Sequence, residues 1–107
     1  MIDGKRKYGL LESDWEKIIE IFTSNPKINK VVLFGSRAKG SFENGSDIDI
    51  ALQGDHLNID DILSAKLAYD KLQLPYKIDI VLFDRIKEKE LIEHINRVGV
   101  ILYSNKE

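Results

Sequence analysis

The stretch that most constrains this chain lies within residues 31–53, where two strand-like segments enclose a glycine loop. An apolar run stops at Gly35 and Ser36, and a strictly alternating run follows after a turn. In this second run Asp47 and Asp49 share one face, while apolar residues occupy the other. A phosphate loop followed by paired carboxylates on a strand indicates metal-assisted phosphate chemistry.

The composition indicates one small globular domain that spans residues 1–107. Hydrophobic residues make up 43% of the chain and charged residues 32%, which favours a soluble fold. The formal net charge of -2 disfavours a long nucleic acid as partner. Cysteine is absent, and no apolar run approaches the ~20 residues of a membrane span. We therefore expect a cytoplasmic protein without a membrane partner.

Apolar periodicity predicts an α/β (α+β) fold with a mixed sheet flanked by helices. The first helix is expected over residues 11–25, with Ser13 as its N-cap. Asn58 is expected to cap a second helix, and Asp84 a third. The expected strands are residues 30–34, 47–53, 77–83 and 100–103.

A third acid, Asp79, lies on the strand predicted over residues 77–83. A helix-length segment separates this strand from the one that carries Asp47 and Asp49, so a parallel crossover is the natural connection. If both strands turn their isoleucines to the same core, all three aspartates lie on the opposite face. Such carboxylates repel one another unless cations neutralise them, and their hard oxygens suit two Mg²⁺ ions.

The glycine loop supplies the features of a phosphate-binding site. Gly35 allows a phosphate to approach the backbone, and the short helical segment after it offers free N–H groups. Ser36 adds a hydroxyl, and Arg37 and Lys39 add positive charge. A nucleoside triphosphate bound here would place its oxygens near the metals. Asp79 would hold the metal nearer the attacking hydroxyl and help to take its proton.

Each of these features can also be explained without a catalytic role. Gly-Ser turns and Asp-x-Asp pairs are common, but strand interiors are depleted in aspartate, which weighs against three incidental acids. His56 and His94 are interpreted as surface or helix-face residues, and Tyr76 as an aromatic at the edge of the core rather than a base-stacking platform. The basic run at residues 5–7 is interpreted as a solvated charge run, with contact to phosphate or an acidic partner as the alternative.

The motif resembles the nucleotidyltransferase superfamily that includes the palm of DNA polymerase beta. Gly35-Ser36 is followed after ten residues by Asp47-Ile48-Asp49, and later by Asp79. The chain is similar above all to the minimal nucleotidyltransferases (MNT), which pair with HEPN-domain partners. This resemblance extends over nearly the whole chain and implies that the first two strands are antiparallel and the third is parallel to the second.

The resemblance further implies Mg²⁺-dependent transfer of a nucleoside monophosphate, AMP from ATP, to a hydroxyl. Asp47, Asp49 and Asp79 would be the catalytic and metal-binding residues. Gly35, Ser36, Arg37 and Lys39 would bind the nucleotide. In the minimal group the acceptor is a tyrosine of a HEPN toxin, so the enzyme is an antitoxin in a toxin–antitoxin system. The alternatives are a non-catalytic toxin-binding module and an enzyme for a small hydroxyl acceptor such as an aminoglycoside. An oligomer is compatible with the sequence.

Overall fold

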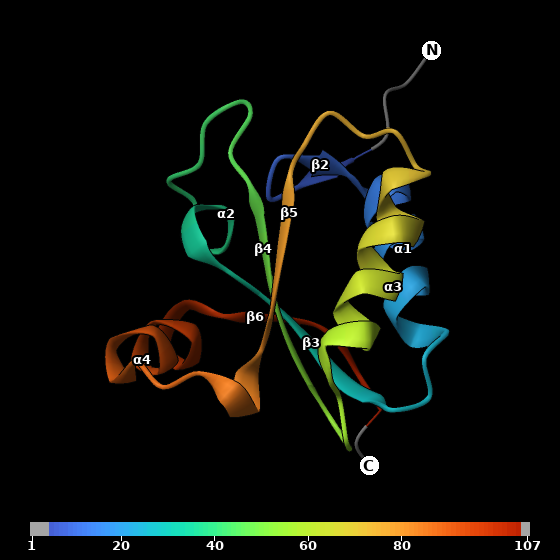
Figure 1. Cartoon of the computed structure of the whole chain (residues 1–107). Helices are drawn as coiled ribbons and strands as arrows, with labels where there is room; N and C mark the ends of the chain where they lie inside the picture. The colour runs from blue at the N-terminus through green and yellow to red at the C-terminus, as the bar shows by residue number, and fades with distance from the viewer. Residues whose placement is uncertain (1–4, 106–107) are drawn as a thin grey trace.

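A four-stranded mixed sheet forms the centre of the computed structural model, which describes residues 5–105 (Figure 1). The strand order is β5-β4-β3-β6. Strand β3 runs antiparallel to both β4 and β6, whereas β4 and β5 are parallel. This topology confirms the mixed sheet expected from the sequence and its antiparallel and parallel pairs. The strands are β3 (Ile28–Phe34), β4 (Ile48–Gly54), β5 (Ile78–Leu82) and β6 (Val100–Ser104).

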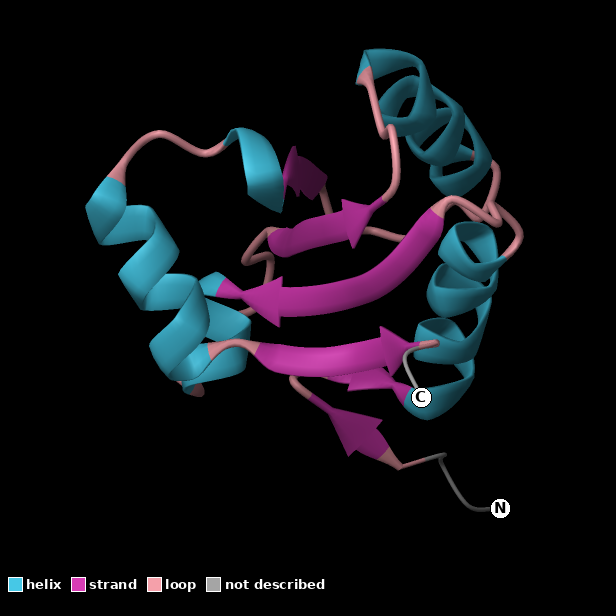
Figure 2. Ribbon diagram, turned by 90° about the horizontal axis from the view of Figure 1, so that it is seen from below, coloured by secondary structure: helices cyan, strands magenta, loops and turns pink. Residues whose placement is uncertain are grey.

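Helices cover both faces of this sheet (Figure 2). Helices α1 (Glu12–Thr23) and α3 (Ile59–Asp70) pack on one face, and α4 (Lys89–Val98) packs on the other. Strand alternation produces the two cores: Ile50 points towards α1 and α3, whereas Ala51 points towards α4. Within residues 5–105, no helix has both the length and the apolar character needed to cross a bilayer.

The first helix begins differently from the prediction. A short hairpin of β1 (Arg6–Lys7) and β2 (Leu10–Leu11) leads directly into α1, and Leu11 is the N-cap residue. The prediction that Ser13 caps this helix is therefore wrong. The backbone N–H of Glu12 instead donates to the carbonyl of Lys5 at 2.8 Å, so the hairpin satisfies a donor that a side chain usually satisfies.

The last helix also begins later than predicted. Asp84 lies in a 3₁₀ turn, η1 (Phe83–Arg85), and α4 starts only at Lys89 with Glu88 as its N-cap residue. The prediction that Asp84 caps this helix is wrong, because the strand first continues into the 3₁₀ turn.

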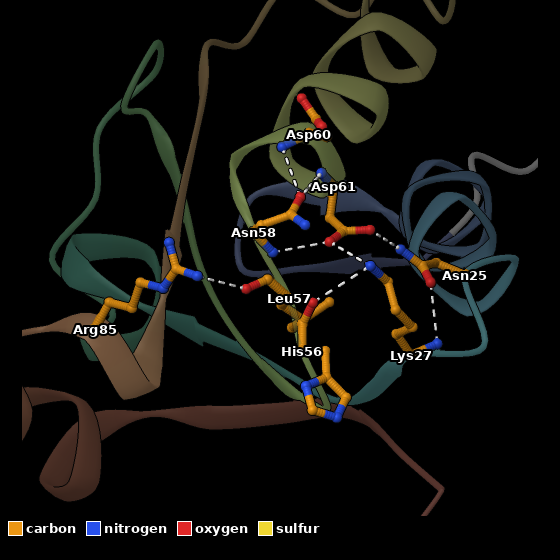
Figure 3. A network of polar contacts seen from close by, with 8 residues as sticks. All are labelled: Asn25, Lys27, His56, Leu57, Asn58, Asp60, Asp61 and Arg85. Atoms are coloured by element: carbon orange, nitrogen blue, oxygen red, sulfur yellow. Dashed lines mark hydrogen bonds and ion pairs between the residues drawn. The ribbon is translucent and has the colours of Figure 1, made fainter.

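The N-terminus of α3 is fixed to the turn before β3 by a polar network (Figure 3). Asn58 and Asp61 form a reciprocal capping box, which confirms the predicted cap. Oδ2 of Asp61 accepts the bond from the Asn58 N–H and also pairs with Lys27 at 2.8 Å. Oδ1 of Asp61 accepts a hydrogen bond from Asn25 at 2.9 Å. These bonds, led by that from Lys27, lower the pKa of Asp61 to about 2.

Replacing Asp61 by Ala is expected to destabilise the protein by about 1–2 kcal/mol at pH 7, because the helix loses the Asp61 half of its capping box and the link to Lys27. Because the folded-state pKa is lowered, this stabilisation is present above pH ~4 and disappears as the pH falls towards 2. Urea unfolding at pH 7 and pH 3 measures the difference.

The neighbouring Asp60→Ala is the matched control, because the Asp60 carboxylate points away from the network (Figure 3). An equal loss of stability in the two variants at pH 7 would contradict the role given to Asp61.

Candidate active site

The predicted carboxylates lie together at one end of the sheet. Asp49 on β4 is the direct register partner of Asp79 on the parallel strand β5. Asp47 comes directly before β4 and has the same strand parity as Asp49. This is the face on which α4 packs, opposite the isoleucines of the main core. Asp47 and Asp79 are exposed and Asp49 is half-buried, so the end of this face remains open to ligands.

The charges of these residues act on one another. The pKa of Asp49 is raised to about 6, mainly by burial and then by the negative charges of Asp79 and Asp47, while the charge of Arg37 opposes the shift. A carboxylate surrounded by like charges favours a bound cation, and its oxygens are the donors that Mg²⁺ prefers. Among residues 5–105, no three acidic, histidine or cysteine side chains converge into a ready-made metal site. Protein-bound Mg²⁺ commonly uses one or two carboxylates and completes its shell with substrate phosphates, so this donor set fits the ion.

The glycine loop lies directly beside Asp49. Gly35 opens the short helix α2 (Gly35–Lys39) with φ +78°, a conformation that residues with a side chain rarely adopt. A Cβ at Gly35 would overlap the carboxylate of Asp49. Ser36 is half-buried in this turn, and Lys39 is exposed at the end of α2. The structure therefore brings the loop and the carboxylates together, as the sequence suggested.

Arg37 has a different position from the one expected for a phosphate ligand. Its guanidinium is buried, with 1% of the residue exposed. Nε and Nη2 donate to the carbonyl of Ser46, and Nη1 donates to the carbonyl of Tyr8 at 2.8 Å. The rings of Phe42 and Tyr76 lie against it. Arg37 thus joins α2 to the segments before β4 and α1, and we do not retain it as a phosphate ligand.

His94 on α4 contacts the glycine loop. The sequence analysis interpreted this histidine as a surface or helix-face residue and missed the contact. Its Nε2 accepts a hydrogen bond from the backbone N–H of Gly35 at 3.1 Å. Its ring lies edge-on to Phe34, with the centroids 6.1 Å apart. Since Nε2 accepts, the neutral ring carries its proton on Nδ1. No spacing in the sequence links His94 to Gly35, because the contact arises from the packing of α4 on the sheet.

This mixed sheet, with a glycine loop beside strand carboxylates, defines a nucleotidyltransferase of the polymerase beta type. The chain belongs to that family, since the family model described as "Polymerase beta, Nucleotidyltransferase" matches residues 16–107. The expected enzyme class is thereby confirmed. A comparison with curated proteins gave no match.

Solved structures share this fold and include toxin–antitoxin complexes. A toxin–antitoxin structure with AMP-PNP has a chain 26% identical to this one, with a TM-score of 0.71, covering 86% of this chain and 74% of that chain. The MntA–HepT toxin–antitoxin structure gives 27% identity and a TM-score of 0.65, covering 88% and 73%. A complex of a tri-AMPylated Shewanella oneidensis HEPN toxin with an MNT antitoxin gives 23% identity, a TM-score of 0.65 and coverage of 88% and 72%. The resemblance to MNT proteins is confirmed.

Replacing Asp49 by Asn is expected to stabilise the metal-free protein at pH 7.5, because it removes a half-buried charge beside two others. The raised pKa means that wild-type Asp49 becomes protonated as the pH falls through about 6. Protonation removes the unfavourable charge, so the wild-type protein becomes more stable relative to the variant at low pH. The difference in melting temperature between the two proteins therefore narrows towards pH 5. Thermal unfolding in EDTA across this range measures the gap.

Asp55→Asn removes an exposed charge just past the other end of β4; it is the control and should not raise the melting temperature at pH 7.5. A lower melting temperature for Asp49→Asn than for wild type at pH 7.5 would refute the electrostatic account of the site.

Replacing His94 by Leu is expected to weaken AMP-PNP binding about fivefold or more, because the Gly35 N–H loses its acceptor and the loop its fixed orientation. His94→Gln offers an amide oxygen in place of Nε2 and should recover most of the affinity. Isothermal titration calorimetry in the presence of Mg²⁺ measures both constants.

The neighbouring exposed residue provides the control variant Glu93→Leu. If the Leu and Gln variants of His94 bind AMP-PNP equally well, the hydrogen bond to Gly35 has no part in nucleotide binding.

Proposed function

We propose that residues 1–107 form one nucleotidyltransferase domain that moves AMP from ATP to a tyrosine hydroxyl of a HEPN toxin, and so acts as a cytoplasmic antitoxin. The observation that carries the proposal is the pairing of Asp49 with Asp79 beside the Gly35 loop. Family membership supports nucleotide transfer as the reaction class. The similar chains in toxin–antitoxin structures, one of them with AMP-PNP, support the adenine nucleotide and the kind of acceptor.

The reaction is an in-line displacement at the α-phosphorus of ATP. The tyrosine oxygen forms a new bond to this phosphorus, and the bond from the phosphorus to the oxygen bridging the α- and β-phosphates breaks. Pyrophosphate leaves with the bridging oxygen, and the proton of the hydroxyl passes to a carboxylate or to water. The product is a phosphodiester between the tyrosine and AMP.

The chain's own residues position the reactants. Gly35 lets the triphosphate approach the backbone, the Ser36 hydroxyl donates to a phosphate oxygen, and exposed Lys39 adds positive charge. Asp79 lies on the edge strand β5, where an acceptor from another molecule can reach it, and it receives the proton of the hydroxyl.

Asp47, Asp49 and Asp79 would hold Mg²⁺ together with the phosphates of the nucleotide. When bound, two Mg²⁺ ions would neutralise the developing charge on the attacking and leaving oxygens. The chain contributes the negative charge that attracts these ions, and it keeps Asp49 half-buried so that this charge is poorly screened by water.

Replacing Asp47 and Asp49 by Ala together is expected to reduce nucleotide transfer at least about a hundredfold, because the metal ligands are lost. The assay incubates the protein with labelled ATP, Mg²⁺ and the product of the neighbouring reading frame as candidate HEPN acceptor, and follows label on that acceptor. The fold should survive, since both carboxylates lie on the open end of the sheet, and circular dichroism checks this.

Two outcomes would overturn the proposal. If the double variant neutralises a toxic partner as well as wild type does, the protein acts by contact alone. If wild type labels a small hydroxyl compound such as an aminoglycoside but no protein, the acceptor class is wrong.

A further inference from the structure

A cavity of about 880 Å³ lies at the same end of the sheet as the carboxylates, but around the edge from their face. Its lining comes from four parts of the chain: the N-terminal hairpin, helix α2, the loop before β4 and the loop before β5. Asp47, Asp49 and Asp79 are not among its lining residues. Its volume is in the range of sites that bind ligands.

Arg37 and two aromatic rings build one wall of this cavity. The guanidinium lies 4.8 Å from the ring centroid of Tyr76 and 5.3 Å from that of Phe42, distances at which cation–π attraction is favourable. At the hairpin turn, Tyr8 and Gly9 both have positive φ, and a Cβ at Gly9 would overlap Arg37 and Phe42. The wall is therefore held in place by close packing and hydrogen bonds, and it presents a shaped, partly aromatic surface.

The hairpin gives the rim of the cavity a positive charge. Arg6 lines the cavity and is exposed, and Lys5 and Lys7 flank it in the sequence. Lys7 pairs with Glu12 at 3.8 Å, but no carboxylate within residues 5–105 pairs with Arg6. Glu43 is the acidic residue of the lining. An acidic ligand in the cavity would therefore meet the exposed guanidinium of Arg6, opposed only by the charge of Glu43 among the acidic residues of the lining.

The cavity leads directly to the strand that carries Asp79. Tyr76 lines it and comes three residues before Asp79, so about 10 Å of extended chain separates the two. Arg37 belongs to the cavity wall, and its charge also lowers the pKa of Asp49. A segment bound in the cavity lies close enough to extend one of its side chains around the end of the sheet to the carboxylates.

We propose that this cavity binds an acidic segment of the acceptor protein, next to the tyrosine that receives AMP. The proposal rests on the proposed function, and it adds the place at which the acceptor docks and the chemistry of the segment. Aromatic residues and arginine are enriched at protein interfaces, and two aromatic rings and the exposed Arg6 line this cavity, while the buried Arg37 supports the rings.

A nucleobase fits the same surface less well. A base is neutral, so it gains little from the positive rim, whereas an acidic segment gains a charge-assisted hydrogen bond from Arg6. Phe42 and Tyr76 each have a ring close to Arg37, which leaves less of their surface for stacking on a base. The cavity also lies beside the strand of the proposed base Asp79.

The test measures Michaelis constants for the acceptor and for ATP separately, with the product of the neighbouring reading frame as acceptor. Arg6→Glu is expected to raise the acceptor constant about five- to tenfold and to leave the ATP constant unchanged. Arg6 is exposed and its one hydrogen bond, to Gly9, is 3.3 Å long, so the variant should fold. Asn44→Lys adds a charge to the lining and should lower the acceptor constant.

Lys87→Glu is the control, an equal charge reversal beyond the opposite end of β5, and it should change neither constant. The proposal is overturned if Arg6→Glu leaves the acceptor constant unchanged, or if it raises the ATP constant instead.

A separate binding measurement distinguishes failure of this inference from failure of the proposed function. Calorimetry without ATP compares binding of the acceptor protein to wild type and to Arg6→Glu. If wild type transfers no label but Arg6→Glu weakens binding, the docking surface stands without the transfer reaction. If wild type and the variant bind equally well, the docking surface is wrong, whatever the transfer assay shows.

Discussion

The end of the sheet is organised by one buried cation. The guanidinium of Arg37 is removed from water, which is unfavourable by several kcal/mol for an isolated charge. Three hydrogen bonds to the carbonyls of Ser46 and Tyr8 compensate, together with two aromatic rings. The contacts of Arg37 reach the N-terminal hairpin, the loop before β4 and the loop before β5. The position of the carboxylate strands therefore depends on this side chain.

The negative charges beside this cation destabilise the metal-free fold but suit the binding of a cation. Strand pairing places Asp49 next to Asp79, and the absence of a side chain at Gly35 leaves room for the Asp49 carboxylate. Burial, followed by the repulsion from Asp79 and Asp47, raises the pKa of Asp49. A sheet selected for stability alone would place β-branched or aromatic residues here, because aspartate is unfavourable in strands. The arrangement is understandable as preorganisation for a cation and its nucleotide.

The alternation of apolar and polar residues predicted the strands well, because it depends only on residues that are close together in the sequence. Alternation around Ile48 and Ile80 fixed which faces are buried, and this correctly placed Asp49 and Asp79 side by side. The sequence could not reveal the contacts that depend on tertiary packing. The burial of Arg37 requires the hairpin turn at Tyr8, and the hydrogen bond from Gly35 to His94 requires α4 to lie over the sheet. Likewise, Ser13 matched a cap motif, but the hairpin provides the acceptor.

The pairing of β3 with β6 has a consequence for how this chain matures. The register joins Lys30 to Ser104, so the central strand gains its second neighbour only from a distant part of the chain. Closing so long a loop makes this pairing slow compared with local contacts. Helix α4, which carries His94, comes directly before β6. A nascent chain that has emerged only as far as β5 thus already has all three aspartates, but its glycine loop still lacks its histidine partner. Completion of the nucleotide site and closure of the sheet are therefore coupled events during synthesis.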